Sequence, residues 1–302
     1  MSRQFSIVEI KPEWISQSEA LGSKTKFWYR ESENATSWLF KYPEEGTGQH
    51  WAEKIAAQVA SQMEILHAPV ELALFDGVKG SSTESFIQQG GKDLFHGNQI
   101  LAGQHSGYLP QKRFKQCDHT LDNIYHALGK TFLEPEGKRK AQSRFAEYLV
   151  LDAVIGNTDR HHENWGILRE QKDAGWVGKL SPTFDHASSL GRELKDSVPN
   201  KICRLKFLTE KRVGAYSEKA PGAIYWNSTD KKGVSPLELV RRANAKHGDL
   251  FQPALLRVKR LDKSVLDSII KMVPDDWMSP LARQFALELM CYNMEELGKI
   301  VK

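Results

Sequence analysis

The sequence predicts an α+β fold, in which a strand-rich N-terminal part precedes a mainly helical C-terminal part. Two observations support this prediction. Short runs of β-branched and aromatic residues dominate roughly the first 100 residues, as is typical of strands. After residue 118, apolar residues instead recur at helical spacing over long segments. We therefore expect two units, one over residues 1–115 and the other over residues 116–302.

Five segments of the N-terminal unit are expected to be strands, and one is expected to be a helix. The strands are FSIVEI (5–10), KFWYR (26–30), SWLFKY (37–42), PVELALF (69–75) and ESFIQQ (84–89). The helix is HWAEKIAAQVASQM (50–63), and Thr47 is a candidate for its N-cap. Glycines at 90, 91, 97, 103 and 107 predict a loop-rich passage after the last strand.

The C-terminal unit is expected to contain long helices and two short strands. The helices are RKAQSRFAEYLVLDAVIG (139–156), PLELVRRANAKHG (236–248), DKSVLDSIIKMV (262–273) and SPLARQFALELMCYNMEELGKIV (279–301). The strands are WGIL (165–168) and a segment around PTFDH (182–186). The helix over 139–156 carries two neighbouring apolar stripes, so we expect it to be buried.

Composition is that of an ordinary globular protein, with 40% hydrophobic and 26% charged residues. The formal net charge of +4 argues only weakly for an anionic partner. Three cysteines lie far apart without a CxxC pair, which argues against a disulfide framework or a zinc ribbon. Because the sequence has neither a signal-peptide pattern nor a long apolar run, we expect a cytoplasmic protein that does not enter membranes. Secretion of an effector by a route not read from hydrophobicity stays open.

A strongly polar segment, IGNTDRHHENWGIL (155–168), separates a predicted buried helix from a predicted strand. Within it, four residues separate Asp159 from Asn164. Phosphoryl transfer uses such a pair, because a carboxylate accepts the proton of the attacking hydroxyl and an amide oxygen binds Mg²⁺. Asp185, 21 residues after Asn164, supplies a second oxygen ligand. Mg²⁺ needs few protein ligands beside phosphates and water, so Asn164 and Asp185 suffice.

Two residues of the N-terminal unit complete this pattern. Lys41 ends an apolar strand, where a long cation reaches the phosphates, and Glu53 in the next helix is placed to pair with Lys41. Each residue has an ordinary alternative when considered alone, since Asp159 and Asp185 suit turns, Lys41 suits a solvated strand edge and Glu53 suits a first helical turn. Their order on a strand-then-helix layout favours a kinase-like site.

The motifs NTDRHHENW and FDHASSLG, with WLFKYP and TGQHWAEKIAAQVA, closely resemble those of the HipA-like kinases. These are bacterial relatives of protein kinases and of phosphatidylinositol 3/4-kinases, and the resemblance covers roughly residues 20 to 300. It implies a two-lobed kinase fold that uses ATP and Mg²⁺ to phosphorylate serine or threonine on a protein. By motif match, it makes Asp159 the catalytic base, Asn164 and Asp185 metal ligands, and Lys41 a phosphate contact with Glu53 as its partner.

The expected phosphate loop departs from GxGxxG. Gly22, Ser23, Lys24 and Thr25 stand just before the KFWYR strand, and one glycine with hydroxyls and a lysine can cradle phosphates through backbone N–H groups and charge. An ordinary turn is the alternative. Hydroxylated loops of HipA-like kinases are sites of autophosphorylation, so we expect Ser23 or Thr25 to be autoregulatory, because a phosphate there would repel ATP.

The resemblance also bears on partners. HipA toxins carry a further N-terminal subdomain, whereas only about 20 residues precede the phosphate loop here, so a companion subunit or antitoxin-like regulator is expected. A toxin–antitoxin role is one alternative that the resemblance offers. Basic clusters at 201–207, 210–214 and 255–263 have few aromatic neighbours, so we expect no direct nucleic-acid binding. The protein substrate is unknown.

Alternatives remain for both the loop and the activity. Adjacent His161 and His162 are poorly spaced for one metal ion, so we expect Arg160 and His161 to brace the loop instead. A phosphoinositide kinase or small-molecule kinase is the second candidate for the activity. A catalytically inactive kinase fold acting as a scaffold is the third.

Overall fold

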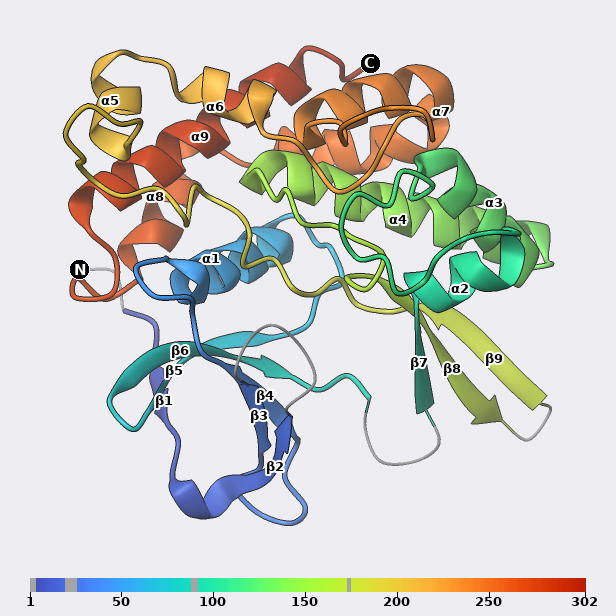
Figure 1. Ribbon diagram of the computed structural model, residues 1–302, viewed down its shortest axis with the longest axis horizontal. Helices are drawn as coiled ribbons and strands as arrows, with labels where there is room; N and C mark the ends of the chain where they lie inside the picture. The colour runs from blue at the N-terminus through green and yellow to red at the C-terminus, as the bar shows by residue number, and fades with distance from the viewer. Residues whose placement is uncertain (1–3, 20–25, 88–91, 173–174) are drawn as a thin grey trace.

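The computed structural model describes residues 4–19, 26–87, 92–172 and 175–302. It has two sheets, and helices cover one side of each (Figure 1). Helix α1 (Gln49–Gln62) lies between the larger sheet and the helices of the C-terminal part. The expected α+β fold is confirmed, and the arrangement places α1 in contact with both parts of the chain.

The larger sheet has six strands in the order β1-β5-β6-β4-β3-β2. They are β1 (Ile7–Glu9), β2 (Ile15–Glu19), β3 (Lys26–Tyr29), β4 (Trp38–Lys41), β5 (Val70–Phe75) and β6 (Val78–Glu84), with a 3₁₀ turn at Pro12–Trp14. Strands β1 and β5 are parallel, and the other neighbours are antiparallel. In this register Lys41, at the end of β4, pairs with Ser81 of β6.

The second sheet has three antiparallel strands in the order β7-β8-β9. They are β7 (Lys92–His96), β8 (Gly166–Lys172) and β9 (Gly175–Leu180). Phe95 pairs with Ile167, and His96 pairs with Gly166. Strand β7 thus comes from the predicted N-terminal unit and pairs with a strand of the predicted C-terminal unit. The boundary at residues 115 and 116 stays a prediction.

The remaining helices build the C-terminal part. They are α2 (Gly97–Gln104), α3 (Leu121–Thr131), α4 (Pro135–Ile155), α5 (Arg204–Thr209), α6 (Val213–Lys219), α7 (Pro236–Val258), α8 (Lys263–Lys271) and α9 (Pro280–Gly298). The side chains of Ser235, Asp262 and Ser279 cap α7, α8 and α9 by accepting backbone N–H groups three residues on. None of the helices in the described ranges is long and apolar enough to span a lipid bilayer.

The main hydrophobic core joins the two parts of the chain. It contains Phe5 and the buried face of α1 together with residues of α4, α7, α8 and α9. A smaller core under the six-stranded sheet is built around Phe27, Tyr29 and Phe40. Asp152 of α4, an acidic residue, is buried at 2% exposure.

Several local predictions were wrong. Residues 85–87 of the predicted strand at 84–89 form no strand and residues 88 and 89 lie outside the described residues, whereas Glu84 ends the earlier strand β6. The low strand propensity of Gly80 hid that strand, yet packing requires the glycine, since a Cβ there would lie 2.4 Å from Phe40 Cζ. Around 182–186, Thr183 forms only an isolated bridge with His67.

Two further local predictions also need correction. Gly48, not Thr47, is the N-cap residue of α1, and the Thr47 hydroxyl donates to the Glu44 carbonyl instead. The glycine-marked passage contains β7 and α2 rather than only loops. At the start of α2 the Gln99 side chain accepts the His96 backbone N–H at 2.9 Å, and sequence spacing gave little sign of it.

Candidate active site

The polar loop begins where α4 ends. Gly156 follows Ile155 with a φ of 65°, a left-handed conformation that glycine adopts without strain and that ends the helix. Beyond it, the side-chain amide of Asn164 donates to the Asp159 carbonyl at 2.8 Å. The loop closes on itself, so Asp159 and Asn164 are neighbours in space as well as in sequence.

A buried ion pair holds this loop against α4. Arg160 Nε and Nη2 each donate to one carboxylate oxygen of Asp152, both at 2.7 Å, and both side chains are 3% exposed. Burial disfavours the charged guanidinium, yet the charge and hydrogen bonds of Asp152 raise the pKa of Arg160 overall. A bidentate pair of this kind fixes the direction of the loop as well as its position.

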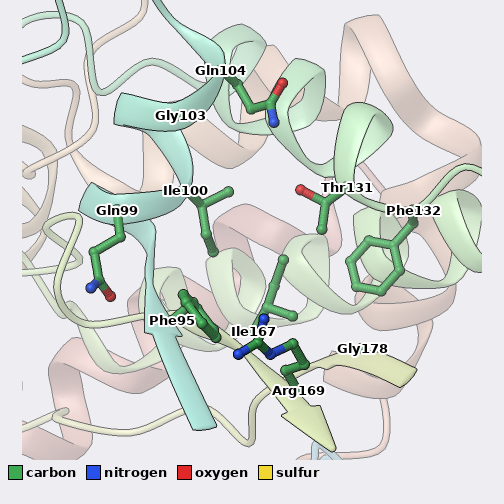
Figure 2. A pocket seen from close by; sticks show the side chains of 10 residues that line it. All are labelled: Phe95, Gln99, Ile100, Gly103, Gln104, Thr131, Phe132, Ile167, Arg169 and Gly178. Atoms are coloured by element: carbon green, nitrogen blue, oxygen red, sulfur yellow. The ribbon is translucent and has the colours of Figure 1, made fainter. Parts of the chain in front are cut away.

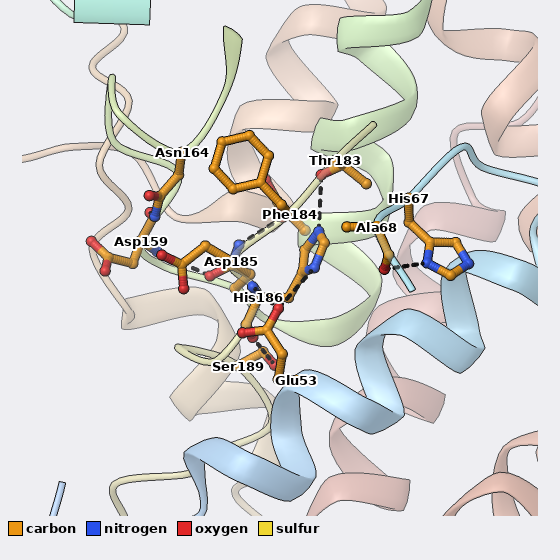
Figure 3. A network of polar contacts seen from close by, with 12 residues as sticks. Glu53, His67, Ala68, Asp159, Asn164, Thr183, Phe184, Asp185, His186 and Ser189 are labelled. Atoms are coloured by element: carbon orange, nitrogen blue, oxygen red, sulfur yellow. Dashed lines mark hydrogen bonds and ion pairs between the residues drawn. The ribbon is translucent and has the colours of Figure 1, made fainter. Parts of the chain in front are cut away.

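Arg160 also connects the two predicted metal ligands. Its Nη1 donates to the Asn164 carbonyl at 2.6 Å and to the Phe184 carbonyl at 3.1 Å. Phe184 directly precedes Asp185, so one buried side chain positions the backbone at both ligands. Figure 3 shows Asp159, Asn164 and Asp185 gathered at this point.

Asp185 has an unusual backbone conformation, with a φ of 60°. Non-glycine residues enter this left-handed region rarely, and aspartate is among those that tolerate it best. Its carboxylate faces the end of β4, where Lys41 Nζ lies 3.2 Å from Asp185 Oδ1. The structure therefore brings Lys41 and Asp185 together from positions 144 residues apart (185 − 41).

Glu53 and His186 form a second buried connection to Asp185. The His186 backbone N–H donates to Glu53 Oε1 at 2.8 Å, and His186 Nδ1 lies 3.5 Å from the same oxygen. On the other side of the ring, His186 Nε2 is 2.9 Å from the Thr183 hydroxyl. Glu53 is 0% exposed, so α1 holds the residue after Asp185 from inside the core (Figure 3).

The Glu53 carboxyl is ionised despite its burial. Burial acts to raise its pKa, but the nearby charge of Lys41 and the hydrogen bond from His186 lower it below the ordinary value. Lys41 forms an ion pair with Asp185, and Glu53 accepts a hydrogen bond from His186. The effect of the Lys41 charge on Glu53 supports the predicted pairing of these two residues, which stays a prediction.

Histidines support the opposite side of the loop. His119 Nδ1–H donates to the Ala223 carbonyl at 3.0 Å, and its Nε2 accepts from Trp165 Nε1 at 3.1 Å. Burial lowers the pKa of His119 to about 3, so its ring is neutral, as these two hydrogen bonds require. His162 Nδ1 is hydrogen-bonded to the Tyr108 hydroxyl at 2.7 Å.

His161 is buried and contacts the segment before α3. Its Nε2 accepts from Arg113 Nε at 3.1 Å, and its Nδ1 lies 3.1 Å from the Glu163 backbone N–H. Burial, with the positive charge of Arg113, lowers its pKa to about 3. These contacts are those of a residue that supports the loop. Among the residues that the structure describes, no group of three or more His, Cys, Asp or Glu side chains could hold a metal ion.

The predicted phosphate-loop residues Gly22, Ser23, Lys24 and Thr25 lie outside the described residues. Sequence reasoning missed the roles of Asp152, Thr183 and His186. A charged residue inside an apolar helical stripe was the available signal for Asp152. Thr183 and His186 gave none, because their partners come from distant parts of the chain.

A cavity of about 380 Å³ lies on the other face of the three-stranded sheet (Figure 2). Phe95 and Ile167 line it, whereas the neighbouring His96 ring faces Phe184 at a centroid distance of 6.2 Å. Alternation along β7 thus separates the cavity from the site. None of the described residues that line the cavity is a predicted site residue.

Comparisons with known proteins identify a family and a relative of this chain. The HipA-like C-terminal domain family matches residues 18–243. The serine/threonine-protein kinase CtkA of Helicobacter pylori is 30% identical over 170 residues, which cover 56% of this chain and 48% of that protein. The alignment therefore spans about half the length of this curated relative.

Two solved structures show the same fold. The crystal structure of a Helicobacter pylori proinflammatory kinase CtkA matches 99% of this chain and 98% of its own, with a TM-score of 0.73 and 18% identity. HipA of Shewanella oneidensis MR-1, solved with HipB and operator DNA, matches 96% of this chain and 69% of its own, with a TM-score of 0.59 and 13% identity. These likenesses confirm the expected two-lobed, kinase-like fold.

Proposed function

The chain belongs to the HipA-like C-terminal domain family, and we propose that it is an ATP- and Mg²⁺-dependent protein serine/threonine kinase. One observation carries the proposal. Lys41, Asp159, Asn164 and Asp185 come from three separate segments, and the Lys41–Asp185 ion pair with the contacts of Arg160 brings them to one place. A base, two oxygen ligands and a phosphate-facing cation are the groups that phosphoryl transfer uses.

Asp159 has the role of accepting the proton of the incoming serine or threonine hydroxyl. The residues suited to hold Mg²⁺ are Asn164, through its side-chain oxygen, and Asp185, through its carboxylate. Mg²⁺, when bound, would neutralise charge on the ATP phosphates. The donor set fits, because the Asn164 amide nitrogen is already directed to the Asp159 carbonyl and both ligand atoms are oxygens.

Lys41 has the role of contacting the phosphates, and Glu53 has the role of orienting Lys41 and the segment after Asp185. The ion pair between Lys41 and Asp185 supports the roles of these two residues, because it brings the proposed phosphate contact close to a proposed metal ligand. Arg160 and His161 have the role of bracing the loop, which their buried contacts support. We assign phosphate binding to Gly22, Ser23, Lys24 and Thr25 on motif position alone, with Ser23 or Thr25 as autophosphorylation sites.

The proposal extends to partners and place of action. A companion regulator is expected, since the HipA structure contains HipB. That structure also contains operator DNA, so the expectation of no nucleic-acid contact gains no support from the comparison. Cys117, Cys203 and Cys291 are free thiols, as suits a protein of the reducing cytoplasm.

The test is incubation of the purified protein with Mg²⁺ and γ-labelled ATP, with and without a mixture of candidate protein substrates. The Asp159→Asn variant removes the base, and Asp249→Asn, at an exposed ion pair with Arg139, is the matched control. Label should appear with the wild type and the control, and should be lost with Asp159→Asn.

Mapping the label tests Ser23 and Thr25 in the same experiment. Absence of label from every protein, with Mg·ATP binding intact by calorimetry, would favour a scaffold. Label on inositol lipid but never on protein would favour the lipid-kinase alternative.

A further inference from the structure

The segment between α2 and α3, residues 105–118, lies against the catalytic loop. A hydrogen bond of 2.7 Å between the Tyr108 hydroxyl and His162 Nδ1 joins the segment to the loop. Two further bonds order the segment itself: the Asn98 side-chain amide of α2 donates to the Pro110 carbonyl at 3.2 Å, and the Gln116 side-chain amide donates to the Leu109 carbonyl at 2.9 Å. The segment is therefore an ordered surface beside the site.

Five residues of this segment form what we call the flank patch. They are Leu109, Lys112, Arg113, Phe114 and Lys115. Phe114 is 71% exposed and Leu109 is 56% exposed. A single exposed apolar residue is ordinary on a protein surface, but two within six positions of one tethered segment, interleaved with cations, form a combined feature that calls for a function.

The charge of the patch is positive. Lys112 and Lys115 are exposed, and the Arg113 guanidinium lies 5.6 Å from the centre of the Phe114 ring. The acidic groups near this segment are Glu163, 3.8 Å from Arg113, and Asp118, 3.9 Å from His105. The patch thus has three cations, and Glu163 is the acidic residue that lies against them. The patch is positive although the whole chain carries a net charge of only +4.

The patch lies on the Asp159 side of the site. Arg113 donates to His161, which is two residues beyond Asp159, and the His161 backbone N–H donates to the Asp159 carbonyl at 2.8 Å. An extended peptide advances about 3.3–3.6 Å per residue, so a chain whose hydroxyl faces Asp159 reaches the patch within a few residues.

We propose that the flank patch docks the protein substrate, through an acidic segment that carries an apolar side chain a few residues from the phosphorylated serine or threonine. This rests on the proposed kinase function. The cations of the patch favour acidic side chains in the substrate, because the charges are complementary. Exposed Phe114 and Leu109 favour an apolar side chain of the substrate, because it can pack against them. A nucleic acid fits less well, because tracking its backbone takes a longer row of cations and Leu109 offers no stacking face.

The test measures binding without turnover. A short fluorescein-labelled peptide with a central alanine in place of serine, one phenylalanine and several glutamates is titrated with the protein, and fluorescence anisotropy is recorded. Comparison peptides replace the glutamates by lysine or the phenylalanine by serine. Variants are Lys112→Glu with Lys115→Glu, and Phe114→Ser. The matched control is Lys259→Glu with Lys263→Glu, two exposed lysines that lie directly after α7 and at the start of α8.

The wild type should bind the glutamate peptide at least about tenfold more tightly than the lysine peptide at low salt, and salt should weaken the difference. The double patch variant should lose this preference, Phe114→Ser should bind phenylalanine and serine peptides alike, and the control should match the wild type. Equal binding of all peptides by the wild type, or an equal loss in the control, would overturn the proposal.

Two further arms separate the alternatives. A random-sequence DNA duplex that displaces the peptide, with Phe114→Ser binding it as tightly as wild type, would assign the patch to nucleic acid and overturn the proposal. Phosphate transfer to the serine form of the peptide is measured separately. Selective binding without transfer would keep the docking surface and contradict the kinase function, so the two failures are distinguishable.

Discussion

Asp159 and Asp185 face one site but are held from different parts of the chain. The Asp159 loop is fixed from within the C-terminal part, by the buried pair of Arg160 with Asp152 of α4. Asp185 is contacted by Lys41 of β4, and the next residue is held by Glu53 of α1. The loop that carries Asp159 and Asn164 is therefore anchored on α4, whereas Asp185 also depends on β4 and α1.

The comparison indicates that the two sides contribute differently to the stability of the fold. Replacing a residue that anchors the Asp159 side should affect folding, because the anchor is a fully buried charge pair. Replacing a residue that anchors the Asp185 side should affect nucleotide and metal handling more than folding. The Phe184 carbonyl, which accepts from Arg160, is the point where the two sides meet.

The largest expected effect is on folding. Arg160→Met should lower the free energy of unfolding by about 3–5 kcal/mol, because the Asp152 carboxylate stays buried without its counter-charge. Urea unfolding followed by circular dichroism measures this. The double variant Arg160→Met with Asp152→Leu should recover much of the loss. Arg139→Met, which breaks an exposed pair with Asp249, is the control and should cost less than about 1 kcal/mol.

The next effect separates the two aspartates chemically. Asp185→Asn should slow phosphate transfer by roughly 10²–10³-fold and raise the Mg²⁺ concentration needed for half-maximal rate. Asp159→Asn should slow transfer while leaving the Mg²⁺ dependence unchanged, because its proposed role is proton acceptance. Rates measured over a Mg²⁺ series at fixed ATP give both values. Equal shifts of the Mg²⁺ dependence in the two variants would contradict the assigned roles.

Acid should weaken the Asp159 side. His119 has a folded pKa of about 3 against about 6.5 unfolded, so between these values the unfolded chain binds the extra proton. Stability is therefore complete above pH 6.5 and falls as the pH falls, by about 2 kcal/mol at pH 5 from this residue. Unfolding at pH 7.5 and pH 5 should differ less in His119→Gln than in the wild type. An identical difference in both proteins would rule out this residue as the cause.

The smallest effect concerns the Asp185 side. Glu53→Gln keeps the size of the side chain but removes the charge that faces Lys41 and His186. We expect a roughly tenfold rise in the KM for ATP, with an unfolding midpoint close to that of the wild type. Glu71→Gln is the control, since Glu71 pairs with Lys54 at the sheet and is partly exposed. A large loss of stability without a change in KM would show that Glu53 is structural only.

Much of this arrangement was predictable from sequence. The 139–156 helix and the strand before Lys41 follow from apolar periodicity, and the polar loop between a buried helix and a strand pointed to Asp159 and Asn164. The Arg160–Asp152 pair was not predicted, because it requires the chain to turn back over the helix it has just left. Likewise, no local pattern connects Glu53 with His186. The two residues are 133 positions apart, and the Glu53 carboxylate accepts the His186 backbone N–H.

The buried position of α1 also has a consequence for the order in which the chain folds. Its apolar face packs in one core with residues of α8 and α9, and the Phe5 backbone N–H donates to the Met272 carbonyl at 2.7 Å. At a synthesis rate of ≈ 5–20 residues per second, about 10–40 s separate the emergence of α1 from that of α8. During that interval on the ribosome, the helix that carries Glu53 has no complete surface to pack against.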